Sequence, residues 1–192
     1  MIPLFVLAVL VATSALEPLA HAAEPKVKTL STAEDATRNT VLIGRNLAAG
    51  MVITFELEAA RSIWMQMDNP PKWRERWVRR GEIYHLDVKP ADAKSKAIIP
   101  YAEVRFSGTN HTSGKRVSGT LHPVWDSGGL HYAANSALAG DGVYALNISV
   151  GMPTVGRSSQ YRNLWLKPVT TQFHFRIAGG KVVEVSDPAG DS

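Results

Sequence analysis

The sequence predicts an all-β fold in which antiparallel strands form a packed sandwich. Short segments alternate apolar and polar residues with the two-residue period of a half-buried strand. Clusters of Gly, Pro, Asn and Asp separate these segments and mark turns. No long segment shows the 3.6-residue period of an amphipathic helix. Short strands joined by turns are typical of a β-sandwich.

The expected strands follow one another from Met51 onward. The clearest is Met51–Ala59, where apolar and polar residues alternate along most of the segment. The others are residues 82–89, 100–107, 116–125, 143–150, 170–177 and 181–186. Residues 139–148 read as a tight turn into an alternating strand, which is common near the last strands of immunoglobulin-like sandwiches. We therefore expect an immunoglobulin-like antiparallel β-sandwich of about seven strands.

The two ends of the chain are expected to lie outside this sandwich. Residues 1–22 read as a secretory signal peptide, because an apolar run ends at Pro18 and the small-x-small step of residues 20–22 follows. The run is shorter than the ~20 residues of a membrane-spanning helix, which argues against a membrane anchor. We expect a flexible lead-in over residues 23–49, the folded domain over 50–186 and a frayed tail over 187–192.

Composition limits what such an exported domain can bind. The chain of 192 residues has no Cys, which excludes thiolate metal sites and thiol redox chemistry. Any metal must be bound by His, Asp, Glu, Met or water. The formal charge of +4 permits an anionic partner without demanding one, and an exported protein is not expected to bind nucleic acid. No catalytic nucleophile motif or phosphate-binding loop is present, so a binding protein is favoured over an enzyme.

Two of the six histidines lie in segments suited to a metal. His85 and Asp87 are two residues apart in an expected strand, so their side chains point to one face. His131 lies in a Gly-rich segment further along the chain. Imidazole and carboxylate ligands together suit a borderline divalent metal ion. A single His on a strand is more often structural, and we expect His111 and His174 to be exposed surface residues.

Four short segments carry a family resemblance. They are His-Leu-Asp at residues 85–87, Ile-Ile-Pro-Tyr at 98–101, Gly-Leu-His-Tyr-Ala-Ala-Asn at 129–135 and Trp-Leu-Lys-Pro-Val at 165–169. Their order and spacing resemble those of the periplasmic iron-transport protein family, whose members accompany inner-membrane iron permeases. The resemblance implies a periplasmic, immunoglobulin-like homodimer that binds copper or iron near the dimer interface.

The resemblance also implies a set of metal ligands. His85 and His131 take the places of two family histidines, and Asp87 stands where the family has Glu. Val124 replaces a metal-binding Met, and His122 shares its face of an extended strand. The family's late His-rich loop has no His in this chain. We therefore expect a site of His85, Asp87, His122 and His131. Without a soft thioether it favours copper(II) and/or iron, with zinc as a further option.

A basic, Trp-containing segment at residues 72–80 suggests a second surface. It is expected to form a solvated hairpin arm whose Trp side chains pack on the sandwich edge. The alternative is a patch that faces a membrane or the permease. That patch would consist of Trp73, Arg74, Arg76, Trp77, Arg79 and Arg80.

Three functions remain open from the sequence. The first is a periplasmic metal-binding protein that assists high-affinity iron uptake with an inner-membrane permease. The second is a metal-free immunoglobulin-like module that binds a membrane or protein partner through the basic Trp arm. The third is a small metal-dependent redox enzyme. Bound metal would separate the first and third from the second, and turnover of ferrous iron would separate the third from the first.

Overall fold

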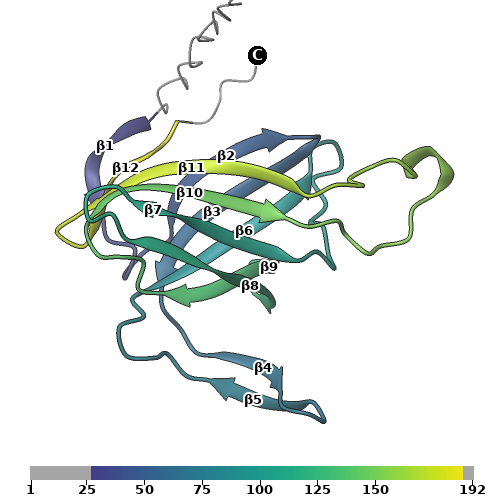
Figure 1. Ribbon diagram of the computed structural model, residues 1–192, viewed down its shortest axis with the longest axis horizontal. Coiled ribbons are helices and arrows are strands. Elements are labelled where there is room, and N and C mark those ends of the chain that lie inside the picture. The colour runs from purple at the N-terminus through teal and green to yellow at the C-terminus, as the bar shows by residue number, and fades with distance from the viewer. Residues whose placement is uncertain (1–26, 188–192) are drawn as a thin grey trace, which may run out of the picture.

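Alternating apolar residues build one continuous antiparallel sheet with a projecting hairpin (Figure 1). The computed structural model describes residues 27–187. Its strands are β1 (Val27–Glu34), β2 (Val41–Ala48), β3 (Met51–Ala59), β4 (Ile63–Met67), β5 (Lys72–Arg76), β6 (Tyr84–Asp92), β7 (Val104–Asn110), β8 (Arg116–Asp126), β9 (Gly129–Ser136), β10 (Gly142–Val150), β11 (Val169–Ala178) and β12 (Lys181–Ser186). Ten of them form a sheet in the order β1-β12-β11-β10-β7-β8-β9-β6-β3-β2, while β4 and β5 pair only with each other.

The long strand β8 turns this sheet into two layers. Its first part pairs with β7 as far as Leu121, and its second part pairs with β9 from His122. The chain therefore passes from one layer to the other between these two residues. The edge strand β2 also meets the opposite layer, because the Asn46 amide of β2 donates to the Thr171 hydroxyl of β11 at 2.9 Å. The result is a sandwich whose sheet is nearly closed.

The core lies between the layers and contains the inward-facing residue of each alternating pair. Phe55 of β3 packs edge-on against Phe173 and Phe175 of β11, with ring centroids 5.4 and 6.0 Å apart. Tyr144 of β10 stacks on Phe175 at 4.8 Å. Burial of each such ring stabilises the fold by roughly 2–3 kcal/mol. This aromatic contact fixes the distance between the layers.

The all-β fold expected from the sequence is confirmed, but the strand count is wrong. The strands at 51–59 and 181–186 match the expected ranges, and the bounds of the five others differ by up to four residues. The expected lead-in over residues 23–49 instead contains β1 and β2, which belong to the same sheet. β1 is exposed along nearly its whole length, so it lacks the alternation that marks a half-buried strand. β9 was also missed, because its Gly-rich start reads as a turn.

Some expectations fall outside the described part of the chain. The signal peptide of residues 1–22 lies wholly outside it, and so does nearly all of the tail at 187–192. Among residues 27–187, no helix is long and apolar enough to cross a membrane. His111 is exposed as expected, whereas His174 is partly buried beside Ser186, so its expected surface position is wrong.

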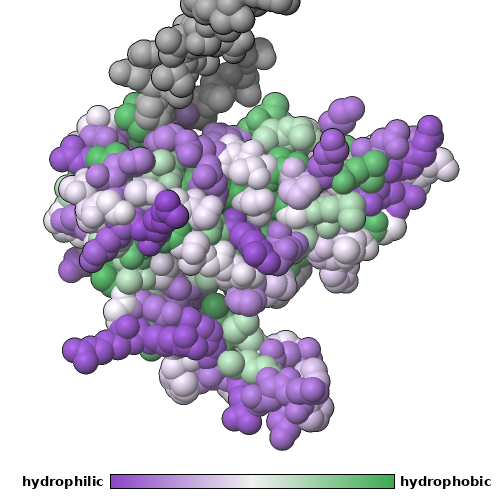
Figure 2. Space-filling model, in the orientation of Figure 1, coloured by the Kyte–Doolittle hydropathy of each residue, from purple (hydrophilic) through white to green (hydrophobic). Residues whose placement is uncertain are grey.

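The basic Trp segment is a hairpin arm, as expected, but its Trp side chains do not pack on the sandwich. β4 and β5 project from the body, and hydrophilic residues alternate with hydrophobic ones on this part of the surface (Figures 1 and 2). Trp73 and Trp77 are 65% and 68% exposed. An ion pair closes the root of the arm: Arg76 lies 2.5 Å from the Glu82 carboxylate, which also accepts the backbone N–H of Arg79 at 2.8 Å.

The Arg76–Glu82 ion pair at the root of the arm makes the stability of the β4–β5 hairpin depend on pH. Burial alone would raise the pKa of Glu82, but hydrogen bonds from Arg76 and Arg79 outweigh it and hold the pKa below the usual 4.5. The stabilisation is therefore complete above that usual value and is lost as the pH falls through the lower pKa of the folded state. We expect Glu82→Gln to remove about 1 kcal/mol from the arm at pH 7.

Amide hydrogen exchange of β4 and β5, corrected for intrinsic rates, measures this effect. Protection should fall about fivefold in Glu82→Gln at pH 7, as it does in the wild type below the pKa of Glu82. The matched control is Glu103→Gln, because the Glu103–Arg105 pair is more than 60% exposed on both sides. Equal protection in the wild type and Glu82→Gln would show that this pair does not hold the arm.

Candidate metal centre

The pairing register brings all four expected ligands to one face. His85 lies opposite Asn135, and Asp87 lies opposite Ala133. On the other side of β9, Ala133 also lies opposite His122, and Val124 lies opposite His131. Directly opposed residues in an antiparallel pair share a face of the sheet. The side chains of His85, Asp87, His122 and His131 therefore stand on the outer face of β6, β9 and β8. Leu86, between His85 and Asp87, and Tyr132, next to His131, point the other way into the core.

A buried amide fixes the tautomer of His85. The side-chain nitrogen of Asn135 donates to the backbone oxygen of Arg61 at 2.8 Å, so its oxygen is the acceptor that faces His85. His85 Nδ1 lies 2.7 Å from that oxygen and must carry the hydrogen. Nε2 is left with a lone pair, and it is buried with no hydrogen-bond partner. Burial lowers the pKa of His85 despite the opposing hydrogen bond to Asn135, which favours the neutral ring that a metal requires.

Asp87 is the second group with an unmet bond. Its side chain is 3% exposed, and Oδ1 has no hydrogen-bond partner. Oδ2 lies 3.4 Å from the Lys89 ammonium and 4.0 Å from Nε2 of His131. Burial raises the pKa of Asp87, whereas His131 and Lys89 act in the opposite direction. An unpaired buried oxygen costs about 1–3 kcal/mol or more, and such a group calls for a missing partner.

His131 presents its other ring nitrogen to the same place. Nδ1 lies 3.1 Å from the backbone oxygen of Gly129, which can only accept, so Nδ1 carries the hydrogen. Nε2 keeps its lone pair and faces the guanidinium of Arg61 at 3.3 Å. The rings of His131 and His85 are 6.4 Å apart between centroids, and both are fully buried. One ring nitrogen of His131 thus lies 4.0 Å from the Asp87 carboxylate, and the ring of His85 stands beside that of His131 on the same face.

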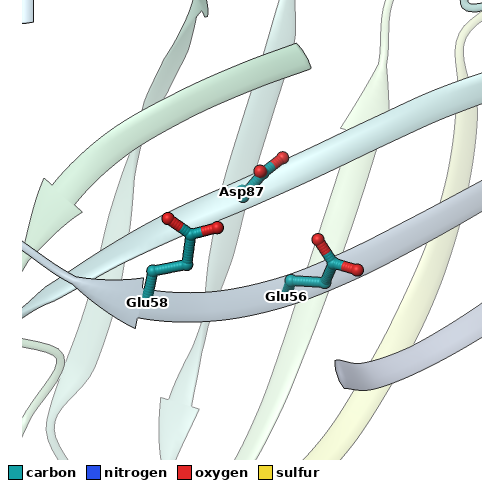
Figure 3. A group of neighbouring side chains, drawn as sticks. All are labelled: Glu56, Glu58 and Asp87. Atoms are coloured by element: carbon teal, nitrogen blue, oxygen red, sulfur yellow. The ribbon is translucent and has the colours of Figure 1, made fainter. Parts of the chain in front are cut away.

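A group of acidic side chains borders the two histidines. Glu56 and Glu58 of β3 and Asp87 of β6 each offer an oxygen within 4.8 Å of the others, and Figure 3 shows the three rising from the same side of the sheet. Lys89 pairs with Glu56 at 2.5 Å, and Arg61 pairs with Glu58 at 3.6 Å. With Asp126, these six side chains comprise four carboxylates and two cations, a formal charge of −2. This charge suits one divalent cation.

His122 shares the face but stands apart from the other three. Its side chain is exposed and lines a groove of about 800 Å³ together with Val124 and Trp125. Within residues 27–187, no hydrogen bond or ion pair joins His122 to the other three expected ligands. The structure therefore places His131 near Asp87 and His85 beside His131, but the three ligand atoms that lie within 4.8 Å of one another belong to Glu56, Glu58 and Asp87, and His122 stands at the rim of the groove.

Sequence reasoning missed several residues that shape this face. Glu56 and Glu58 alternate within the clearest strand of the chain, so their shared face was visible, but the sequence did not show that β3 pairs with β6. Asn135 lies four residues after His131 in a strand and thus on the same face. No sequence signal singled out Arg61, which follows the end of β3.

The donors that converge here fit a divalent metal of intermediate hardness. Two imidazole nitrogens and a carboxylate oxygen are the ligands preferred by copper(II), zinc and ferrous iron. The unpaired Nε2 of His85 and Oδ1 of Asp87 are the missing bonds that such an ion would make. Asn135 holds His85 from behind through the ring nitrogen that would not bind the metal.

The fold and this donor set define an all-β sandwich with a buried nitrogen–oxygen site. A family model described as Fe2+ transport protein matches residues 82–179. This chain belongs to that family, and the resemblance seen in the sequence is confirmed. A UPF0423 protein of Brucella suis is 26% identical over 167 residues, which cover 78% of this chain and 88% of that protein.

Solved structures share the fold. A copper-bound variant of Campylobacter jejuni P19 superposes with a TM-score of 0.58 at 21% identity, covering 78% of this chain and all of P19. FetP of uropathogenic Escherichia coli gives a TM-score of 0.54 at 19% identity, covering 73% of this chain and 97% of FetP. Because the sequence identities are this low, the two superpositions show only that the folds are alike.

The buried contacts of Asn135 predict a measurable effect on stability. Asn135→Ala removes the hydrogen bonds to His85 Nδ1 and to the Arg61 backbone, and it leaves those groups buried. We expect a loss of about 2 kcal/mol in the free energy of unfolding by urea. The ring nitrogens of His85 should also lose their single tautomer in long-range ¹⁵N–¹H NMR spectra.

The matched control is Asn147→Ala, because Asn147 makes one exposed hydrogen bond to Gln172 on a distant strand pair. It should cost less than about 1 kcal/mol. An unchanged tautomer of His85 in Asn135→Ala would contradict the role given to the amide.

Proposed function

We propose that this protein is a periplasmic metal-binding component of high-affinity iron uptake that works with an inner-membrane permease. Two lines of reasoning support the proposal. The chain belongs to the Fe2+ transport protein family, and its sequence begins with the pattern of a secretory signal peptide. The relatives P19 and FetP have been solved with copper bound.

One observation carries the metal assignment. Two buried ligand atoms, His85 Nε2 and Asp87 Oδ1, have no hydrogen-bond partner, and His131 Nε2 lies 4.0 Å from the Asp87 carboxylate. Two neutral imidazoles and one carboxylate would hold the metal, and His122 at the rim completes the proposed set of four. We assign copper(II) and/or iron, with zinc as a further option; copper(II) has the highest intrinsic affinity for such ligands.

A bound copper or iron ion would supply one-electron redox chemistry or serve as the cargo itself. The chain's own residues prepare the site for it. Asn135 keeps the hydrogen of His85 on Nδ1 so that Nε2 retains its lone pair, and the Gly129 carbonyl does the same for His131. The formal charge of −2 on the carboxylates and cations around the histidines would attract a divalent cation before any ligand bond forms.

We also propose that the protein is a homodimer and meets its partners through the arm and groove. Trp64, Trp73 and Trp125 are each more than 60% exposed, and all three line the groove beside the site. Large exposed aromatic residues that border one groove mark a surface that becomes covered. Light scattering after gel filtration tests the dimer, and a monomer at micromolar concentration would remove it. The same exposure favours a membrane-facing or permease-facing arm as a second role.

Calorimetry of the chelator-stripped protein tests the proposed function directly. We expect binding of copper(II), zinc or ferrous iron at micromolar or lower concentration. His85→Ala and His131→Ala should each weaken binding at least a hundredfold, because each removes one of the central ligands. The matched control is His111→Ala, since His111 is exposed in a turn away from the site. Absence of binding by the wild type would leave the metal-free interaction module as the function.

We expect the side chain at position 124, directly opposite His131, to influence which metal ion the site prefers. Val124 is directly paired with His131, so a longer side chain at this position lies next to the imidazole. Val124→Met adds a soft thioether, and we expect about tenfold tighter binding of copper(I) with little change for zinc. Competition with a chromophoric copper(I) chelator measures the change. Val117→Met, on the part of β8 that pairs with β7, is the matched control and should change neither affinity.

A further inference from the structure

The guanidinium of Arg61 faces the ring nitrogen of His131 that a metal ion would bind. One guanidinium nitrogen lies 2.8 Å from Asp126 Oδ2 and 3.3 Å from His131 Nε2. The other terminal nitrogen lies 3.6 Å from Glu58 Oε2. A single cationic side chain therefore contacts two carboxylates and donates to the lone pair of a proposed metal-binding imidazole.

The backbone of Arg61 is held more firmly than its side chain. Its N–H and C=O are bonded to the Asn135 amide at 3.3 and 2.8 Å, the same amide that positions His85. The side chain is 37% exposed and lines the groove of about 800 Å³. The guanidinium can therefore leave the imidazole for the groove while the backbone continues to support His85. Lys89 pairs with Glu56 and Asp87, and among the described residues no hydrogen bond or ion pair joins it to a histidine.

We propose that Arg61 is a resident cation of the centre, which holds His131, Asp126 and Glu58 until a metal ion displaces its guanidinium. This inference rests on the proposed metal-binding function. Displacement costs the contacts of Arg61, so Arg61 weakens the net affinity for metal and favours release. Arg61 is thus a positioning residue that sets how tightly the metal is held.

The sign of the effect separates this role from a merely structural one. Removing a structural support would weaken both folding and metal binding, whereas removing a competitor strengthens metal binding. Arg61→Met keeps the length of the side chain, removes its charge and leaves the backbone bonds to Asn135 in place. We expect Arg61→Met to bind zinc about tenfold more tightly than the wild type, the ratio that a partly exposed charged contact supports.

The experiment is calorimetry with zinc alone on the wild type, Arg61→Met and Arg61→Lys, with thermal melting to confirm folding. Arg61→Lys keeps a charge but cannot span both carboxylates, so its affinity should fall between the other two. The matched control is Arg105→Met, because Arg105 forms an exposed pair with Glu103 away from the site.

The outcomes distinguish this inference from the proposed function. Tighter binding by Arg61→Met supports the inference, also where the wild type binds no zinc at all. Equal or weaker binding by Arg61→Met beside a wild type that binds zinc overturns the inference and leaves the function standing. Absence of binding by wild type and variant, with zinc and with copper(II), overturns both.

Discussion

The register of β3, β6, β9 and β8 is the constraint on which the rest of the structure depends. Side chains alternate along each strand, so a slip of one residue would exchange the two faces. In the native register, Leu86 and Tyr132 enter the core, while His85, Asp87 and His131 stand on the outer face. The hydrophobic core and the polar centre are therefore two results of one pairing. Burial of the apolar face stabilises the register, and the register places the ligands.

Two buried atoms on the polar face have no hydrogen-bond partner, although the core of the sandwich is well packed. His85 Nε2 and Asp87 Oδ1 lack hydrogen-bond partners although both are buried, and each unpaired atom lowers the free energy of unfolding. The aromatic core offsets this cost, since Phe55, Phe173 and Phe175 are almost completely buried between the layers. Such a division is expected where stability and function compete, because atoms that bind a ligand cannot also be saturated by the protein.

Asn135 and Arg61 connect the centre to the projecting arm. The Asn135 amide holds His85 on one side and the backbone of residue 61 on the other. Residue 61 lies between β3 and the arm's first strand β4, and its side chain reaches His131. Both histidines are thus tied to the root of the arm. Movement of the arm would therefore act on the residue whose side chain contacts His131, Asp126 and Glu58.

The sequence by itself determined the all-β class, most of the strands of the sandwich and the shared face of His85 and Asp87. These follow from local periodicity, which alternation along one strand makes visible. It failed at β1, whose exposed position removes the alternation, and at the arm, where the Trp residues are exposed instead of packed. Only the tertiary structure decided that Glu58 lies opposite His85, that Asn135 fixes its tautomer and that Arg61 reaches His131. These contacts join residues from different strands and loops, and only the strand pairing sets which of them meet.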